Sequence, residues 1–478
     1  MSNIRLYNTF TRSKENLSPI EEGVARIYSC GPTVYASPHI GNFRAFLFAD
    51  ILRRSLEFFG LKVIHVMNVT DVGHLVGDSN AGEDKLEKGA KITGKTVWEV
   101  ARGYEDEFKR DLLELNIEKA TYFPRATEHI VEQLEMIKTL TAKGFTYETS
   151  DGIYYDVSKF ADYGKLSGQS LEDKIAGARV EVKDEKRNQA DFALWKFCVG
   201  ENANHTMRWD FSGKDVSSEA HLSEEENKEK KIGFPGWHIE CSAMGMKYLG
   251  ETFDIHTGGV DHIPVHHENE IAQSEAATGK KFVNIWMHNE FLAVDGGKMS
   301  KSLGNLYTLE DLKKKGFEPL SFRYLTLLTH YRKKLDFTWE ALKAATSALQ
   351  NLREIYQTLP DAEIPLASAV KEFGEALADD LNTAKALAVA WEIAKNENIT
   401  PGMKKATLAK FDEVLGLELD KAAEAVELNE SQKKLLVERE TARKNKEWQK
   451  SDALRDELAQ LGIEVEDTSE GQIVKRKL

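Results

Sequence analysis

The segment from residue 26 to residue 69 constrains the fold more than any other part of this sequence. Arg26 to Cys30 is rich in β-forming residues, and Gly31-Pro32-Thr33 breaks that strand. Apolar residues recur at helical spacing from Phe43 to Phe58, and Lys62 to Val69 has the composition of a buried parallel strand. Strand, helix and strand in this order predict a βαβ unit within an α/β fold.

A polar turn, His39-Ile40-Gly41-Asn42, opens the predicted helix. A helix N-terminus offers free N–H groups and the positive end of a dipole, which together attract phosphate. Gly41 lets the backbone approach a nucleotide closely, and His39 and Asn42 add side-chain donors. The other interpretation of this turn is a plain helix cap.

A second phosphate-binding candidate is Lys298-Met299-Ser300-Lys301-Ser302, a loop preceded by Gly296-Gly297 and followed by Gly304. Two lysines on a loop between glycines could close over a polyphosphate and open again. An exposed lysine turn is the alternative. Together with the earlier turn, the loop predicts a phosphate-binding site in which His39, Asn42, Lys298 and Lys301 meet developing negative charge.

Cysteine, histidine and glutamate residues suggest a metal site. His266 and Glu270 lie four apart in a predicted helix running to Ala277, so they share one face. Cys30 ends the first strand and Cys241 follows Trp237-His238-Ile239-Glu240. Zinc accepts Cys, His and carboxylate ligands together. A lone buried cysteine is more often a small apolar residue, and Cys198 is interpreted in that way.

Composition excludes several classes of protein. A length of 478 residues predicts three or four domains, and no long apolar run predicts a membrane span. Three cysteines favour a reducing compartment, and the N-terminus lacks a signal-peptide pattern, so a cytoplasmic location is expected. A net charge of −14 disfavours broad nonspecific binding to nucleic acid, although local basic patches still allow RNA to dock.

The pattern changes several times along the chain. Further strands are expected at Phe253 to His256 and Phe282 to Met287, and helices over about 95–145. A polar, charged segment over 200–231 is expected to be solvated. The sequence is mostly helical beyond 306, with amphipathic stretches at Val370 to Lys395 and Lys404 to Leu415, and a charged stretch from Glu430 to Leu461 that Gly462 ends.

Four longer stretches resemble cysteinyl-tRNA synthetases, a family of class I aminoacyl-tRNA synthetases. They are Cys30 to Tyr35, Gly236 to Met244, His266 to Glu270, and Trp286 to Asn289 leading into Lys298 to Gly304. The turn at His39 and the lysine loop fit the same family. The sequence departs from it at Asn42, where many class I members have a second histidine, and at Val474, where the family often has tryptophan.

The resemblance implies a domain order. A Rossmann-like parallel-sheet catalytic domain is interrupted by an inserted connective subdomain and followed by a helical bundle and a small anticodon-binding domain. The expected boundaries are 1–120 and 232–305 for the catalytic halves, 121–231 for the insertion, 306–345 for a linking region, 346–425 for the bundle and 426–478 for the anticodon-binding domain.

The resemblance also implies roles for individual residues. One zinc ion per chain would be held by Cys30, Cys241, His266 and Glu270. Thr70, Trp237 and Asp261 would bind the amino acid, with Asp261 pairing to its ammonium group. Gly41, Gly258 and Gly259 would pass close to the nucleotide.

Anticodon recognition would fall to Arg443, Trp448, Asp452, Arg455 and Asp467. Their chemistry suits this role, because arginine and aspartate can read base edges and tryptophan can stack on unpaired bases. From Lys433 to Lys450 there are seven Lys/Arg residues against three Glu, so this stretch is locally basic inside an acidic chain. A solvated charged helix is the alternative.

The leading hypothesis is ATP-dependent ligation of L-cysteine to tRNA(Cys) through a cysteinyl-adenylate, with Mg²⁺ accompanying ATP and the chain acting as a monomer. Zinc would read the thiol, because a soft thiolate binds zinc far better than the hydroxyl of serine does. One alternative is a cysteine ligase with a small amino-sugar acceptor. The other is a non-catalytic protein that binds zinc and a nucleotide.

Overall fold

The computed structural model describes residues 3–73, 84–169, 185–300, 303–421, 428–468 and 471–476. At its centre lies a parallel sheet with the strand order β10-β9-β3-β4. These strands are β3 (Val24–Ser29), β4 (Lys62–Met67), β9 (Phe253–Gly259) and β10 (Val283–Asn289). The predicted parallel sheet is therefore confirmed. The winding direction reverses between β3 and β9, which creates a topological switch point there.

Helix α1 (Ile40–Phe58) connects β3 to β4, as the βαβ prediction requires. Helices α7 (Trp237–Leu249) and α8 (His266–Thr278) flank β9 in the sequence. Phe43, Phe46 and Phe48 of α1 are buried, and Phe46 meets Phe108 with ring centroids 4.9 Å apart. Because α1 also packs against the C-terminal helices, both halves of the molecule share its surface.

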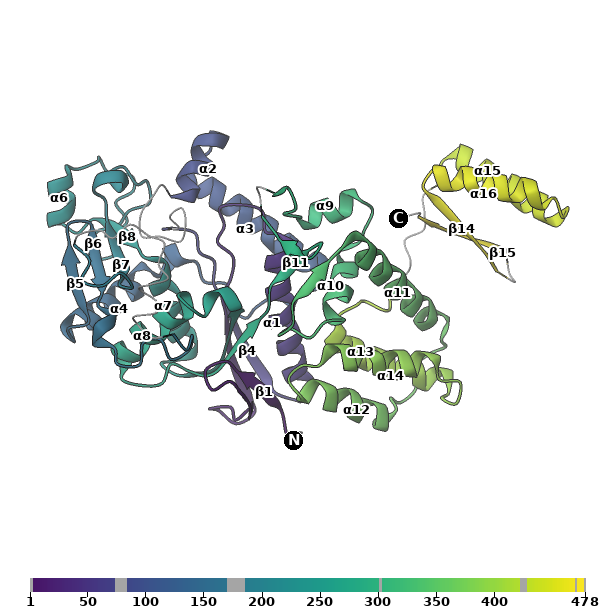
Figure 1. Cartoon of the computed structure of the whole chain (residues 1–478), viewed down its shortest axis with the longest axis horizontal. Helices are drawn as coiled ribbons and strands as arrows, with labels where there is room; N and C mark the ends of the chain where they lie inside the picture. Colours follow the sequence, from purple (N-terminus) through teal and green to yellow (C-terminus); the bar gives the residue numbers. More distant parts are fainter. Residues whose placement is uncertain are drawn as a thin grey trace.

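A long insertion separates β4 from α7; its antiparallel sheet lies to the left in Figure 1, and its first helices lie above, toward the centre. Its helices are α2 (Lys85–Thr93), α3 (Val97–Glu114), the 3₁₀ turn η2 (Ala126–His129) and α4 (Ile130–Ala142). An antiparallel sheet follows, formed by β5 (Thr146–Thr149), β6 (Gly152–Tyr155), β7 (Phe192–Phe197) and β8 (Gly233–Pro235), with η3 (Val157–Lys159) after β6. The expected helical stretch over 95–145 is thus interrupted after Glu114.

The polar segment over 200–231 differs from the expectation of a solvated excursion. It contains η4 (Gly200–Asn202) and α6 (Glu224–Glu229), and α6 is largely exposed as expected. The part between them packs inward, because Met207, Trp209 and Val216 are almost fully buried. The Trp209 N–H donates to the Gly233 carbonyl at 2.8 Å, which ties the segment to β8. The burial of these few apolar residues therefore orders a segment whose average composition is polar.

A small sheet of β12 (Gly297–Lys298), β11 (Leu292–Val294) and β13 (Leu335–Phe337) carries the start of the lysine loop. The helices beyond it are α9 (Leu309–Lys314), α10 (Pro319–Leu327), α11 (Trp339–Thr358), α12 (Ala367–Ala378), α13 (Thr383–Lys395) and α14 (Pro401–Leu415). They form the helical bundle to the right of the sheet in Figure 1. Gly416 ends α14 in the left-handed region, as its position predicts.

The expected continuous amphipathic stretch from Val370 to Lys395 is broken between α12 and α13. Asp380 and Leu381 adopt positive φ angles of 66° and 55°. The Asp380 carboxylate accepts hydrogen bonds from the Tyr331 hydroxyl at 2.6 Å and the Tyr7 N–H at 2.9 Å. Tyr7 lies in the N-terminal hairpin of β1 (Arg5–Asn8) and β2 (Ser13–Asn16). A tertiary contact therefore fixes a break that local propensity does not indicate.

The C-terminal unit consists of α15 (Glu430–Lys444), α16 (Trp448–Gln460) and the antiparallel pair β14 (Ile463–Thr468) and β15 (Gly471–Arg476). It has its own small core of Leu436, Leu458, Ile463 and Val465, and Figure 1 shows it apart from the bundle. The charged stretch over 430–461 is two helices, with Lys446 at φ 62° between them, and Gly462 follows the second at φ 78°.

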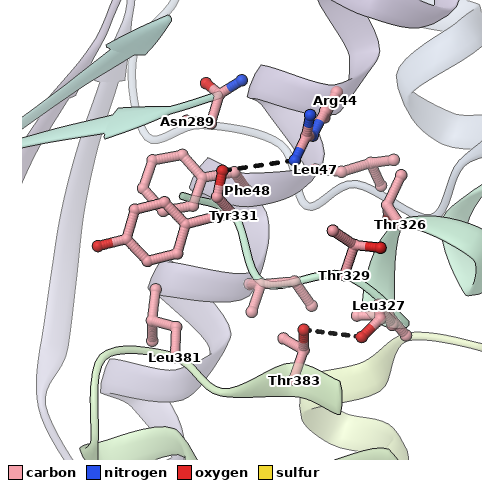
Figure 2. Close-up of a pocket in the computed structure, with 11 residues that line it drawn as sticks. Arg44, Leu47, Phe48, Asn289, Thr326, Leu327, Thr329, Tyr331, Leu381 and Thr383 are labelled. Carbon is pink, nitrogen blue, oxygen red and sulfur yellow. Dashed lines mark hydrogen bonds between the residues drawn. The ribbon is translucent and has the colours of Figure 1, made fainter. Parts of the chain in front are cut away.

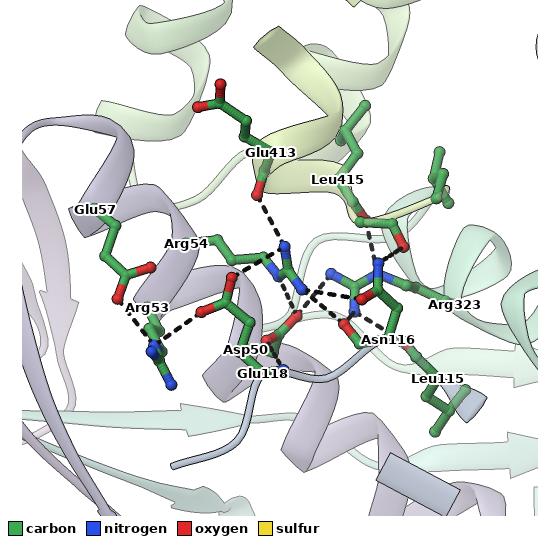
Figure 3. A network of polar contacts seen from close by, with 12 residues as sticks. Asp50, Arg53, Arg54, Glu57, Leu115, Asn116, Glu118, Arg323, Glu413 and Leu415 are labelled. Atoms are coloured by element: carbon green, nitrogen blue, oxygen red, sulfur yellow. Dashed lines mark hydrogen bonds and ion pairs between the residues drawn. The ribbon is translucent and has the colours of Figure 1, made fainter. Parts of the chain in front are cut away.

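A buried network of charges joins the catalytic half to the bundle (Figure 3). Asp50 of α1 accepts hydrogen bonds from Arg54 at 2.8 Å and from Arg323 of α10 at 2.7 Å. Arg323 has no exposed surface and also donates to the carbonyls of Leu115 and Leu415. The two arginine charges hold the pKa of Asp50 below its usual value against the opposing effect of burial.

Replacing Asp50 with alanine should strongly destabilise the protein, because it leaves two buried guanidinium groups without their anion. Breaking one side of a buried ion pair typically costs about 3–5 kcal/mol. Urea unfolding of Asp50→Ala should therefore show a much lower midpoint than the wild-type chain. Glu57→Ala is the matched control on the same helix. Glu57 pairs with Arg53 near the surface, where such pairs contribute roughly 0–1 kcal/mol. Equal midpoints for the two variants would contradict the importance of the network.

Candidate active site

The carboxyl ends of the parallel strands meet at the switch point of the sheet. Cys30 directly follows β3, Asn68 follows β4, and Gly258 and Gly259 end β9. The Gly31 N–H donates to the Asn68 side-chain oxygen at 2.8 Å. A Cβ on Gly31 would lie 1.7 Å from the Asn68 carbonyl oxygen, so only glycine allows the two strand ends to approach this closely.

The turn at the start of α1 forms a reciprocal cap. The Asn42 N–H donates to His39 Nδ1 at 3.2 Å, and the His39 N–H donates to the Asn42 side-chain oxygen at 3.0 Å. This is the arrangement that usually pairs a serine or threonine with a glutamate. Asn42 therefore has a structural role at this turn, because its side chain completes the cap. The helix-cap interpretation and the phosphate-binding interpretation are compatible at this turn.

The lysine loop lies directly over that turn. A Cβ on Gly41 would come within 2.5 Å of the Met299 methyl carbon, and the Ile40 N–H donates to the Tyr307 carbonyl at 2.9 Å. Asn305 closes the loop, because its side chain accepts from the Ser300 N–H and donates to the Lys298 carbonyl. Lys298 is exposed. Lys301, the second predicted lysine, lies outside the described residues.

Potential metal ligands gather beside the end of β3. Cys30, His266, His267 and Glu270 each offer one ligand atom, and these atoms lie within 4.8 Å of one another. His266 and Glu270 face the cluster from consecutive turns of α8, as their spacing predicts, with His266 Nε2 3.1 Å from Glu270 Oε1. Cys30 Sγ lies 3.2 Å from His267 Nε2.

Cys241, on α7, joins this cluster. Its side chain forms hydrogen bonds with Cys30 and His266, and it is buried. The hydrogen bond from the Cys30 thiol lowers the pKa of Cys241 to about 6, although burial opposes this shift. Of the four predicted zinc ligands, Cys30, His266 and Glu270 thus lie in one group with His267, while Cys241 adjoins this group at Cys30 and His266. Cys198 packs in the same apolar core but is not in the group of candidate ligands, and the charged group that acts on its thiol is Arg208.

The charges of the cluster suit a cation. Burial by itself would raise the pKa of Glu270, but the imidazoles of His256 and His266 lower it to about 2. Glu270 Oε2 accepts a hydrogen bond from His256 at 3.0 Å, while the buried Oε1 has His266 Nε2 at 3.1 Å but no well-aligned hydrogen bond from any described residue. An unsatisfied buried carboxylate oxygen is unfavourable unless a cation or donor meets it. The sulfur, nitrogen and oxygen donors present fit zinc.

Further histidines orient the candidate ligands. His238 Nδ1 lies 3.0 Å from His266 Nδ1, and His288 Nε2 lies 2.7 Å from His267 Nδ1. The contacts of His238 and His288 were not predicted from the sequence. A signal was present, since His238 is three residues before Cys241 on one helix face and His288 lies near the carboxyl end of β10.

The predicted amino-acid-binding residues surround the same cluster. Thr70 is buried and donates to Glu240 at 2.8 Å. The Trp237 ring stacks on His266 with centroids 4.6 Å apart. Asp261 is exposed, and a Cβ on Gly259 would lie 2.2 Å from its carboxylate. Gly258 approaches His267 in a similar way, so all of these candidates lie around one site.

The predicted anticodon residues lie in the C-terminal unit. Asp467 accepts contacts from Arg443 at 2.7 Å and Arg455 at 2.8 Å, and also from Arg439, which has no exposed surface. These arginines lower the pKa of Asp467, the hydrogen bond from Arg439 most of all. Arg439 was missed in the sequence, where a buried arginine in a charged helix is indistinguishable from an exposed one.

Two more of these residues lie at the surface of the unit. Trp448 is 56% exposed, with the Arg443 guanidinium 5.8 Å from its ring centroid. Asp452 is exposed and lies 3.9 Å from Arg455. Three arginines around one aspartate leave the group positively charged beside an exposed aromatic ring, which is a suitable surface for unpaired bases.

Comparison with known families decides the identity of the chain. Residues 16–215 and 221–347 match the family described as tRNA synthetases class I (C) catalytic domain. Residues 372–420 match the DALR domain, and residues 425–474 match the cysteinyl-tRNA ligase anticodon binding domain.

The chain belongs to the cysteinyl-tRNA ligase family. It is 46% identical to Cysteine--tRNA ligase 1 of Burkholderia lata over 472 residues, which are 98% of this chain and 96% of the relative. It is 43% identical to Cysteine--tRNA ligase of Treponema denticola over 512 aligned positions, covering 99% and 100% of the two chains. Membership confirms the predicted family and makes the chain a class I aminoacyl-tRNA synthetase acting on cysteine and tRNA.

Solved structures share the fold at low identity. Mycobacterium tuberculosis methionyl-tRNA synthetase in complex with methionyl-adenylate superposes with a TM-score of 0.52 at 15% identity, covering 82% of this chain and 89% of that chain. LeuRS of Agrobacterium radiobacter, in a ternary complex with tRNA and LeuAMS, superposes with a TM-score of 0.56 at 12% identity. The superposition covers 84% of this chain and 85% of that chain. No helix within the described residues is long and apolar enough to cross a membrane. The cytoplasmic location and the monomeric state stay predictions.

Substituting Gly31 with alanine should disrupt the site of this cysteinyl-tRNA ligase family member. The new Cβ would collide with the Asn68 backbone, and the strand ends that hold Cys30 and Thr70 would have to separate. We expect a lower unfolding midpoint and loss of bound metal, measured by elemental analysis of the purified protein. Gly103→Ala is the control. Gly103 lies within α3 with open space around it, and alanine there favours the helix by roughly 1 kcal/mol. Full metal content in Gly31→Ala would contradict the close-approach argument.

Proposed function

We propose that this chain ligates L-cysteine to tRNA(Cys) through a cysteinyl-adenylate intermediate, with a zinc ion held by Cys30, Cys241, His266 and Glu270. The observation that carries the proposal is the buried cluster of sulfur, nitrogen and carboxylate donors at the switch point of the sheet. When bound there, zinc would supply a soft Lewis acid that prefers a substrate thiolate to a hydroxyl. His267, beside Cys30, would line the same cavity and orient its neighbours.

The residues around the cluster fit an amino acid substrate. Thr70 and Trp237 border the cluster from the segment after β4 and from the start of α7, and Asp261 offers an exposed carboxylate to the substrate ammonium group. The carboxylate of cysteine would then point toward the start of α1. Positioned in this way, the reactants need little further assistance, because orientation alone can supply a large part of the barrier reduction.

ATP would bind between the turn and the lysine loop, with Mg²⁺ on its phosphates. The N–H groups at the start of α1 and the turn built by His39, Gly41 and Asn42 would face the α-phosphate. Lys298 and Lys301 would meet the charge that develops on pyrophosphate as it leaves. Gly258 and Gly259, at the end of β9, would leave room for the adenosine.

The acceptor would be a tRNA whose anticodon meets the C-terminal unit. Trp448 is exposed for stacking, and Arg443, Asp452 and Arg455 surround it with hydrogen-bonding groups. Asp467 is engaged by three arginines, so its first role would be to fix the directions of their donors. The match to an anticodon binding domain favours tRNA over a small amino-sugar acceptor.

Amino-acid-dependent ATP–pyrophosphate exchange tests this proposal. Cysteine should support strong exchange and serine almost none, and addition of tRNA(Cys) should yield charged tRNA. A site built around thiol chemistry should discriminate by several orders of magnitude, beyond the roughly 10- to 200-fold that shape alone achieves for a difference of one methylene. Equal exchange with serine would overturn the thiol-reading argument. Exchange without transfer to tRNA would instead favour the small-acceptor alternative.

Replacing Cys241 with serine should remove both the metal and cysteine-dependent exchange. The hydroxyl stays protonated at neutral pH and cannot replace a thiolate ligand. Zinc content and exchange rate should therefore fall together, while the far-ultraviolet circular dichroism spectrum stays close to that of the wild type. Cys198→Ala serves as the control, because Cys198 is buried but does not belong to the group of candidate ligands, so its loss should leave both quantities intact. An active, metal-free Cys241→Ser protein would exclude zinc from substrate recognition.

A further inference from the structure

Arg44, on the second turn of α1, is a buried charge outside the sites described so far. Its side chain is 4% exposed, and its guanidinium donates to the backbone carbonyls of Phe291, Tyr331 and Lys333. None of the carboxylates in the described part of the chain lies within ion-pair distance of it. Burial lowers the pKa of Arg44 to about 10, so the group stays charged at neutral pH.

Fully buried arginines normally meet a carboxylate, as Arg323 does at Asp50. Arg44 instead directs its donors toward backbone oxygens of two separate chain segments. Hydrogen bonds of this kind fix the path of the backbone. The segments that Arg44 holds therefore indicate its role.

Those segments lead into β11 and β13, two strands of the small sheet that carries Lys298. Phe291 directly precedes β11, and Lys333 lies two residues before β13. The two strands pair in parallel, starting where the Leu335 N–H donates to the Phe291 carbonyl at 3.2 Å. On the other side of β11, Lys298 is paired with Ala293. We call the sheet of β11, β12 and β13 the lysine arm, because it presents the lysine loop. Arg44 thus holds the base of this arm, where β11 and β13 begin.

The same helix presents the phosphate turn. Arg44 lies two residues after Asn42, and on the far side of the loop Ile40 is hydrogen-bonded to Tyr307. The arm is therefore attached to the first two turns of α1 at both of its ends. These two attachments set the spacing between the turn at His39 and the loop at Lys298.

The junction around Arg44 is not densely filled. Figure 2 shows a pocket between α1, the end of β10 and the break before α13, lined by Arg44, Phe48, Asn289, Tyr331, Leu381 and Thr383 among others. The Asn289 side-chain oxygen is buried there and accepts no hydrogen bond. Incomplete packing beside the base of the arm makes its position depend on polar contacts, and Arg44 supplies three of them.

We propose that Arg44 is a positioning residue for adenylate formation: it fixes the arm carrying Lys298 against the helix carrying His39 and Asn42. This inference rests on the proposed adenylation chemistry. Arg44 itself touches neither substrate. Its loss should therefore impair the use of ATP, while zinc binding and the recognition of cysteine stay intact.

The test compares Arg44→Gln and Arg44→Lys in ATP–pyrophosphate exchange. For Arg44→Gln, kcat/KM for ATP should fall by about 10- to 100-fold, since small misplacements of reacting groups reduce rates on this scale. The KM for cysteine and the zinc content should be unchanged. Arg44→Lys should recover part of the loss, because its ammonium group can still donate to one or two of the three carbonyls.

Arg54→Gln is the matched control. Arg54 is another buried arginine on the same helix, but its partners are Asp50, Asn116 and Glu413. This variant should lower the unfolding midpoint and leave the KM for ATP unaltered. Hydrogen exchange supplies an independent readout, because amides over 290–300 should exchange faster in Arg44→Gln and at the wild-type rate in Arg54→Gln.

Two results would overturn the inference. One is Arg44→Gln with wild-type kinetics for ATP and wild-type amide protection over 290–300. The other is an equal loss of ATP use in Arg54→Gln, which would mean that stability alone is being measured. A wild-type chain without cysteine-dependent exchange would instead overturn the proposed function and the catalytic role of Arg44 with it, while the exchange-protection data would still report whether Arg44 holds the arm.

Discussion

Helix α1 carries three buried charged side chains, Arg44, Asp50 and Arg54, and each requires a polar partner. The arrangement of the molecule follows from the partners that they meet. Asp50 and Arg54 meet Arg323 of α10 and the carbonyls that end α3 and α14. Arg44 meets the base of the lysine arm. A buried charge without partners is very unfavourable, so the sheet, the bundle and the arm can dock in few ways other than the observed one. A helix predicted simply as the crossover of a βαβ unit is therefore the point at which three parts of the enzyme are held together.

This arrangement explains why the site lies where it does. The start of α1 points toward the carboxyl ends of β3 and β9, where the winding of the sheet reverses. Gly31 allows the ends of β3 and β4 to touch, which places Cys30 and Thr70 near one another. The insertion then returns the chain at β8, and α7 delivers Cys241 to the same point. Ligand candidates that lie more than two hundred residues apart in the sequence are thus brought together by the ends of two strands and the starts of two helices.

Much of this could be predicted from the sequence, and the reasons are local. The βαβ unit depends on runs of apolar residues, and the spacing of His266 and Glu270 depends only on helix geometry. The helix break at Asp380, the packing of Trp209 against β8 and the burial of Arg439 could not be predicted, because each depends on a distant partner. For the same reason, the sequence alone does not distinguish His238, His256, His267 and His288, whose contacts the structure defines.

The break at Asp380 also relates the bundle to the site. Its carboxylate holds Tyr331 and Arg332, whose neighbour Lys333 is one of the two residues at the base of the lysine arm. A rearrangement of the bundle when tRNA docks would therefore act on the backbone from Tyr331 to Lys333, to which Arg44 is hydrogen-bonded. These contacts run through one short segment between α10 and β13, so covalent and hydrogen-bonded steps join the bundle to the base of the lysine arm. A chain that used separate, loosely joined domains for activation and transfer would lack such a link between its acceptor and its phosphate site.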